Sequence, residues 1–484
     1  MTEQRPNLLF IMPDQLRHDF LSCYGADFIE TPHIDSICQN GVRYSRAYSP
    51  SPLCVPMRSS LLTGLNSIRT GVLSNGEYLR PDFEACGILT WPAMLREMGY
   101  HTCSIGKMHF YPWEASMGFD DRIICEDKRW LLVDDDYQKY LNRKGLRKLG
   151  GSEHIGYQEN RGAVVHQHSY EDSWDGFVGN ETVRYLREYS GDSPFAMMVG
   201  FPGPHCPYDP SPEYADLYSP DNMPEPYGIA PGEPAGFVEN SVRGNLGSWN
   251  GVDYSEFTTK HKRKIRAHYS ALVKQIDQKV GEIIAALKET GRYNNTVIIF
   301  CSDHGDYLGD HGMIGKGSFF ESSTRVPLIV GNLGLETPHV HENPASIADI
   351  TATLLRLGGC EIPSYMDSQP LADLAIEGAE ARERVFGFVS DASMNYDGRW
   401  KLVRYSNGWS ALFDIEEDPA EQHNRINDPE CQEIRERLDR ELVSQMLSSI
   451  YRANAEKQHK TDPFDTEFAN GESGWQRLYP LPLQ

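Results

Sequence analysis

Three apolar runs of strand length each lead into polar residues, and this feature constrains the fold most strongly. Residues 7–12 (NLLFIM), 195–200 (FAMMVG) and 296–301 (TVIIFC) are almost continuously apolar, which is typical of strands buried on both faces of a parallel sheet. Asp14 follows the first run and Asp303 the third. Because the carboxyl ends of parallel strands meet at one edge of an open α/β sheet, we expect these side chains to gather there.

The segments between these runs also have distinct characters. Residues 260–291 carry apolar side chains at helical spacing and end at a glycine, which predicts a long amphipathic helix. Residues 206–258 are dense in Pro, Gly, Asn, Asp and aromatic residues, which indicates a structured loop insertion over the sheet edge. We expect substrate contacts in that insertion.

The pattern changes after about residue 385. Residues 400–404 and 411–414 flank an Asn-Gly turn and predict antiparallel strands, and a charged helix is expected near 430–448. A chain of 484 residues is long enough for a large α/β domain with a smaller one appended. We predict a large, mostly parallel mixed sheet sandwiched by helices over 1–385, a small α+β domain over 386–455, and an extended tail over 456–484. The aromatic residues of the tail predict docking on a neighbouring subunit, and therefore a homo-oligomer.

The charge balance excludes some partners. Lys and Arg number 46 against 69 Asp and Glu, a net charge of −23, and without a basic run nucleic acid is not an expected partner. An anionic substrate would need a locally cationic pocket. The apolar stretch 8–12 is too short for a signal peptide core, no stretch reaches transmembrane length, and the ten cysteines form no C-x-x-C pair. We therefore expect a cytoplasmic protein without a membrane partner.

One short motif carries the functional prediction. Cys54-Val-Pro-Met-Arg58, followed by Thr63-Gly64, comes after the first run and before a predicted helix. It resembles the signature of the type I sulfatases of the alkaline phosphatase superfamily, which implies an alkaline-phosphatase-like fold. The resemblance also implies that a formylglycine-generating enzyme oxidises Cys54 to an aldehyde. Its hydrate, a gem-diol, can attack with one oxygen and eject the product with the other. The competing interpretation is a buried structural cysteine at a helix start.

Two residue pairs indicate a metal site. Asp14-Gln15 and Asp303-His304 supply oxygen and nitrogen ligands for a divalent cation, and residue 54 would complete the shell. These pairs resemble those of choline sulfatases and phosphonate monoester hydrolases, whereas better-known sulfatases have a second Asp and often an Asn. We expect calcium, with manganese also admitted because imidazole suits softer ions.

The same resemblance supplies the cationic pocket. Lys107 and His109 lie in a G-K-x-H element, His205 follows a proline, and Arg58 and Lys316 complete the set. The resemblance implies that Arg58, Lys107 and Lys316 neutralise the sulfuryl oxygens. It also implies that His205, with Lys316, protonates the leaving oxygen and that His109 takes the proton of the second hydroxyl.

Asn75 matches an Asn of the related hydrolases and is expected to contact the sulfate or the leaving group, although an Asn before a glycine is also common in turns. The resemblance covers about Pro6 to Asn427 and is closest to the choline-sulfatase and bacterial arylsulfatase branch. We therefore predict hydrolysis of a small-molecule sulfate monoester and leave open an aryl, choline or sugar leaving group. The alternatives are a phosphonate monoester or phosphodiester hydrolase on this scaffold and a non-catalytic anion-binding protein.

Overall fold

The computed structural model describes residues 5–230, 235–247, 250–335 and 337–457. Everything after Lys457 lies outside this description, including nearly all of the predicted tail and its proposed contact with another subunit. Within the described residues, no helix combines the length and the apolar character needed to cross a membrane.

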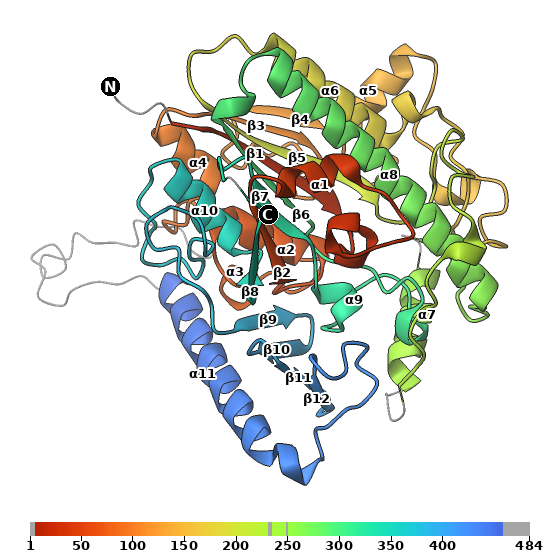
Figure 1. The fold of residues 1–484 in the computed structure, drawn as a ribbon, viewed down its shortest axis with the longest axis vertical. Coiled ribbons are helices and arrows are strands. Elements are labelled where there is room, and N and C mark those ends of the chain that lie inside the picture. Colours follow the sequence, from red (N-terminus) through yellow and green to blue (C-terminus); the bar gives the residue numbers. More distant parts are fainter. Residues whose placement is uncertain (1–4, 231–234, 248–249, 336, 458–484) are drawn as a thin grey trace, which may run out of the picture.

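An eight-stranded mixed sheet forms the centre of the molecule (Figure 1). All neighbouring strand pairs are parallel except those of β7 with β6 and with β2, so the prediction of a mostly parallel mixed sheet is confirmed. The strands across the sheet are, in order, β4 (Asp121–Ile124), β3 (His101–Gly106), β5 (Phe195–Pro204), β1 (Asn7–Asp14), β6 (Thr296–Cys301), β7 (Leu328–Gly331), β2 (Val42–Tyr48) and β8 (His339–Ser346).

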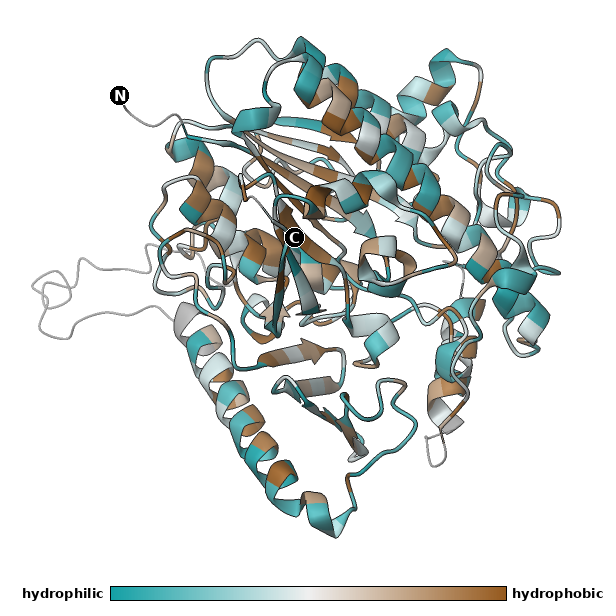
Figure 2. Ribbon diagram, viewed as in Figure 1, coloured by the Kyte–Doolittle hydropathy of each residue, from teal (hydrophilic) through white to brown (hydrophobic). Residues whose placement is uncertain are grey.

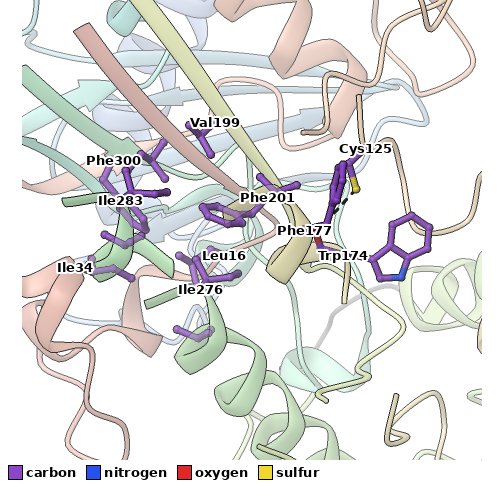
Figure 3. Close-up of a cluster of buried hydrophobic side chains, with 14 of the residues drawn as sticks. Leu16, Ile34, Cys125, Trp174, Phe177, Val199, Phe201, Ile276, Ile283 and Phe300 are labelled. Atoms are coloured by element: carbon purple, nitrogen blue, oxygen red, sulfur yellow. Dashed lines mark hydrogen bonds between the residues drawn. The ribbon is translucent and has the colours of Figure 1, made fainter. Parts of the chain in front are cut away.

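Successive residues of the central strand point to opposite faces, and each face is covered by helices. Leu9 and Ile11 join one core cluster and Leu8 and Phe10 another, which explains why the run is apolar without alternation. Figure 3 shows the first cluster, where Ile283 of the long helix lies near Phe300 of the sheet and Ile276 lies near Leu16. The first face is covered by α1 (Pro32–Cys38), α6 (Trp174–Glu188) and α8 (Thr259–Glu289), the second by α2 (Cys54–Thr63), α4 (Trp91–Glu97) and α10 (Asp349–Leu357).

A smaller antiparallel sheet packs beside the main one (Figure 1). Its strands are β9 (Val385–Val389), β10 (Ala392–Tyr396), β11 (Trp400–Tyr405) and β12 (Ser410–Asp414). One of its faces joins Tyr48 and Phe319 of the main domain in a shared core, and the other packs against α11 (Gln432–Lys457). Figure 2 shows apolar residues concentrated in the central strands, whereas α8 and α11 alternate between apolar and polar residues. The amphipathic helix predicted over 260–291 is confirmed as α8.

The other α-helices of the described residues are α3 (Ser67–Thr70), α5 (Asp136–Arg143) and α9 (Glu321–Thr324).

The predicted loop insertion 206–258 is more regular than expected, because it contains the helix α7 (Ala235–Leu246). Helix α7 stands at the side of the molecule near the small sheet (Figure 1). A window rich in glycine and asparagine has low intrinsic helix propensity, so the composition concealed this helix.

Candidate active site

The ends of β1 and β6 and the start of α2 bring four potential metal ligands together. Asp14 is the last residue of β1, Cys54 is the first of α2, and Asp303 and His304 follow β6. The Cys54 Sγ lies 3.1 Å from His304 Nε2 and 3.8 Å from Asp14 Oδ1, and His304 Nε2 lies 3.8 Å from Asp303 Oδ1. One ligand atom of each residue lies within 4.8 Å of the others, and all four residues are buried.

Helix α2 positions Cys54 and Arg58, the first and last residues of the C-x-P-x-R motif. Asn75 accepts a hydrogen bond from the backbone N–H of Val55 at 3.0 Å, so it satisfies one of the N–H groups that the start of a helix leaves without a partner. Arg58 lies one turn after Cys54 and therefore on the same side of the helix. Gly64 ends the helix in the left-handed conformation (φ 69°), which accounts for the glycine at this position.

The Arg58 guanidinium links the two strand ends. It donates to Asp303 Oδ2 at 2.9 Å, to Asp14 Oδ2 at 3.0 Å and to the carbonyl oxygen of Lys107 at 2.8 Å. The side chain is fully buried. Arg58 therefore fixes the relative positions of the two carboxylates and supplies them with a counter-charge.

Lys107 and His109 follow the end of β3. Lys107 Nζ lies 2.8 Å from Asp14 Oδ2 and also forms an ion pair with Asp127. The backbone of His109 is left-handed (φ 60°), its N–H is held by Glu126, and its side chain lies beside Cys54 and helps to lower the pKa of that thiol. The left-handed conformation is uncommon for a residue with a side chain, and here it turns the imidazole toward the cluster.

His205 and Lys316 form a second pair at the site. Lys316 Nζ lies 2.6 Å from His205 Nε2 and 2.5 Å from Gln15 Oε1, and His205 Nδ1 lies 2.7 Å from the carbonyl oxygen of Cys206. The carbonyl can only accept, so Nδ1 carries the hydrogen and Nε2 accepts from the lysine. Burial, together with the charges of Lys316 and Arg129, lowers the pKa of His205 to about 3. The imidazole is therefore neutral, and the transferable proton of the pair resides on Lys316.

Both polar atoms of the Gln15 side-chain amide are hydrogen-bonded to neighbouring side chains. Its backbone N–H donates to Asp303 Oδ1 at 3.0 Å, its amide nitrogen donates to Asp306, and its amide oxygen accepts from Lys316. Asp306, for which no role was predicted, also accepts from the Tyr208 hydroxyl at 2.7 Å. Its signal in the sequence is its place in the segment Ser302-Asp-His-Gly-Asp306, which resembles the family's pattern. The structure brings all the predicted site residues together at one sheet edge.

The electrostatics of the four-residue cluster fit a divalent cation. Burial opposes ionisation of Cys54, but the charges of Lys316, Lys107 and His304 hold its pKa well below the usual range. Burial and the neighbouring Asp14 carboxylate raise the pKa of Asp303. The carboxylates of Asp14 and Asp303 and the thiolate of Cys54 therefore lie close together in the protein interior, where their negative charges repel one another. The Nδ1–H of His304 donates to the carbonyl of Gly305 at 3.0 Å, which leaves Nε2 facing the cluster. Two carboxylates and an imidazole are ligands that can hold a divalent cation.

A cavity of about 810 Å³ opens beside the cluster. Asn75, His109 and Lys316 lie in its wall, so the cavity reaches side chains that border the four-residue cluster. The predicted insertion contributes through α7, whereas the contribution of the small domain was not anticipated. The residues from these two parts are Phe237, Asn240, Ser241, Gly244 and Asn245 of α7, and Ser390, Asp391, Tyr405 and Asn407 of the small domain.

Comparison with known families identifies the family of this chain. The family model described as Sulfatase matches residues 6–360, and the model described as N-sulphoglucosamine sulphohydrolase, C-terminal matches residues 309–448. The first match covers more than half of the chain. The chain therefore belongs to the sulfatase family, and it is an enzyme of that family.

Individual relatives agree with this assignment. The chain is 33% identical to a choline-sulfatase of Rhizobium meliloti, with 89% of this chain and 84% of the relative covered. It is 31% identical to an arylsulfatase of Clostridium perfringens, with 90% and 92% covered. Among solved structures, the phosphonate monoester hydrolase of Agrobacterium radiobacter superposes with a TM-score of 0.75 at 24% identity, over 92% of this chain and 96% of that one. This last similarity concerns the fold.

Proposed function

We propose that the protein hydrolyses a sulfate monoester with a formylglycine made from Cys54 and one divalent cation. The observation that carries the proposal is the position of Cys54, which is buried at the start of α2, with its Sγ 3.1 Å from His304 Nε2 and 3.8 Å from Asp14 Oδ1. A structural cysteine would not need this surrounding of charged groups. The sulfatase family and the choline-sulfatase and arylsulfatase relatives support the sulfate ester as substrate.

The hydrated aldehyde, with one of its two hydroxyls already ionised, would attack sulfur through that oxygen while the bond from sulfur to the leaving alcohol breaks. Lys316, held by the neutral His205, is placed to protonate the departing oxygen. Arg58 and Lys107 surround the sulfuryl group with positive charge that needs no rearrangement during the reaction. His109 would then take the proton of the second hydroxyl, so that the carbon–oxygen bond breaks, sulfate leaves and the aldehyde returns.

Asp14, Cys54, Asp303 and His304 would hold the cation, and the amide of Gln15 lies next to them. When bound, such a cation acts as a Lewis acid that stabilises negative charge on oxygen. Calcium is the proposed ion, with manganese as the alternative. Maturation by a formylglycine-generating enzyme, a homo-oligomeric state and a cytoplasmic location stay predictions.

Phosphonate monoester hydrolysis is the second candidate, because the structure of a phosphonate monoester hydrolase superposes well on this fold. Lys107 and His109 favour the sulfatase, because the phosphonate monoester hydrolases that the sequence resembles carry hydroxyl-bearing residues in place of this K-x-H element. The leaving group stays open: one superposing structure, with a TM-score of 0.72 and 20% identity, contains D-glucosamine-2-N,6-O-disulfate as its substrate. The cavity has room for a leaving group of that size.

Two measurements test the proposal. Mass spectrometry of the peptide that contains residue 54 should give the mass expected for the aldehyde or its hydrate and not the mass expected for cysteine. Protein with this modification should hydrolyse a nitrophenyl sulfate faster than a phenyl phosphonate ester. An unmodified Cys54 in fully active protein would contradict the formylglycine, and preference for the phosphonate ester would favour the second candidate.

A further inference from the structure

The loop after β4 surrounds the Lys107–His109 segment with side chains that belong to none of the family motifs. Asp127 lies at its centre and is 1% exposed. Its carboxylate is paired with Lys107 Nζ at 2.5 Å and, through both oxygens, with Arg129 Nε at 2.5 Å and Nη2 at 2.6 Å. His109 Nδ1 lies 3.9 Å from the same carboxylate. One buried carboxylate therefore faces three basic side chains next to the nucleophile.

Lys107 is held from two sides. Its ammonium group lies between Asp14 Oδ2, a potential metal ligand, and Asp127 Oδ2. An ammonium on a flexible four-carbon stem has no fixed orientation of its own. Without Asp127, the attraction of Asp14 would act alone and draw Lys107 toward the metal site, away from where a sulfuryl group would be bound.

The loop also shapes the wall of the cavity. Arg129 and Trp130 line the cavity beside His109, and the Trp130 ring meets the His109 imidazole edge to face at 4.9 Å. The two-point pairing with Asp127 fixes the plane of the Arg129 guanidinium. The positive charge of Arg129 therefore faces the cavity beside His109.

We propose that Asp127 is a positioning residue of the sulfuryl pocket: it holds Lys107 and Arg129 so that both present positive charge to the anionic group of the substrate. This inference rests on the proposed function. Asp127 acts through the two cations. Its single negative charge offsets only one of the two positive charges of Lys107 and Arg129, so the three side chains together stay positive.

The experiment compares Asp127→Asn with Asp209→Asn. The first substitution would keep the shape of the side chain but remove the charge that holds both cations. Asp209 is a matched control, because it is buried and pairs with the buried Lys128 at 2.8 Å, one residue further along the same loop, yet it does not line the cavity. For each metal-loaded protein we would measure the dissociation constant of inorganic sulfate by titration calorimetry, kcat and KM for a nitrophenyl sulfate, metal content and the thermal midpoint.

We expect both variants to lose thermal stability, but only Asp127→Asn to weaken sulfate binding and kcat/KM, each by about 10- to 100-fold, as is typical when the partner that orients a site residue is lost. Metal content should stay at the wild-type level. Sulfate affinity and kcat/KM within twofold of wild type in Asp127→Asn, or equal losses in the two variants, would overturn the inference. Wild-type protein that binds sulfate in an Asp127-dependent way but hydrolyses no sulfate ester would overturn the proposed function and support the role of Asp127.

Discussion

Replacing Arg58 by methionine tests whether the two carboxylates at the strand ends are charged and whether a cation binds between them. Arg58 gives three hydrogen bonds, two of them to Asp14 and Asp303, and all three side chains are fully buried. Methionine fills a similar volume without charge. The variant therefore removes the one cation that both buried carboxylates share, and breaking such a buried pair costs about 3–5 kcal/mol.

This free energy converts into a measurable shift. With an unfolding entropy of about 2 cal/mol/K per residue, a chain of 484 residues has about 1 kcal/mol/K in total, so the thermal midpoint should fall by about 3–5 °C in metal-free protein. A divalent cation between the carboxylates would replace the lost counter-charge, so the fall should be clearly smaller in the presence of excess calcium or manganese. Scanning calorimetry of both proteins, with chelator and with metal, measures the two shifts.

Arg266→Met provides the control. Arg266 is also buried and pairs with Asp310 at 2.6 Å, outside the metal cluster. Its loss should lower the midpoint by the same amount with and without metal. A metal-free Arg58→Met protein within about 1 °C of wild type would refute the idea that both carboxylates are ionised. A shift that metal leaves unchanged would refute binding of the cation between them.

Four further predictions concern the chemistry and the pH dependence. Prolonged chelation should abolish turnover and calcium or manganese should restore it, whereas full activity of demonstrably metal-free protein would contradict a required cation. Cys54→Ser should release at most one equivalent of phenol from an activated aryl sulfate and keep a stable sulfo adduct in its intact mass, because serine lacks the second hydroxyl; sustained turnover would exclude the gem-diol. Lys316→Ala should slow esters of poor leaving groups by about 10²- to 10⁴-fold and nitrophenyl sulfate much less, so equal losses would argue against proton donation. Burial lowers the pKa of His166 to about 4 against an ordinary 6.5, so the unfolded chain binds the extra proton and about 3 kcal/mol of stability, present above pH 6.5, should be lost between pH 6.5 and 4. Thermal midpoints measured against pH should therefore fall less steeply for His166→Gln, and identical slopes would contradict this origin.

The sequence was informative where a local pattern has one structural meaning. The apolar runs at 7–12, 195–200 and 296–301 have the length and the lack of alternation that only a doubly covered parallel strand requires, and each is a central strand of the sheet. The motif at Cys54 resembles a signature that stands before a helix, and α2 begins at Cys54. Gly64 ends this helix in a conformation that favours glycine.

The sequence was less informative where contacts join distant segments. Asp127 and Arg129 lie in a charged stretch without a motif, and only the packing of the loop against the end of β3 brings them to Lys107. The small domain reaches the cavity through Asp391 and Asn407, which read locally as turn residues. Helix α7 was hidden by its composition.

The sequence by itself therefore determined the three central strands, the helix that begins at Cys54 and the set of residues that gather at the strand ends. The tertiary structure decided which of their atoms meet: that Arg58 spans Asp14 and Asp303, and that Lys316 directs a proton to the neutral Nε2 of His205. The physical reason is that strand and helix periodicity are local properties of the chain, whereas ion pairing and burial depend on which surfaces pack together.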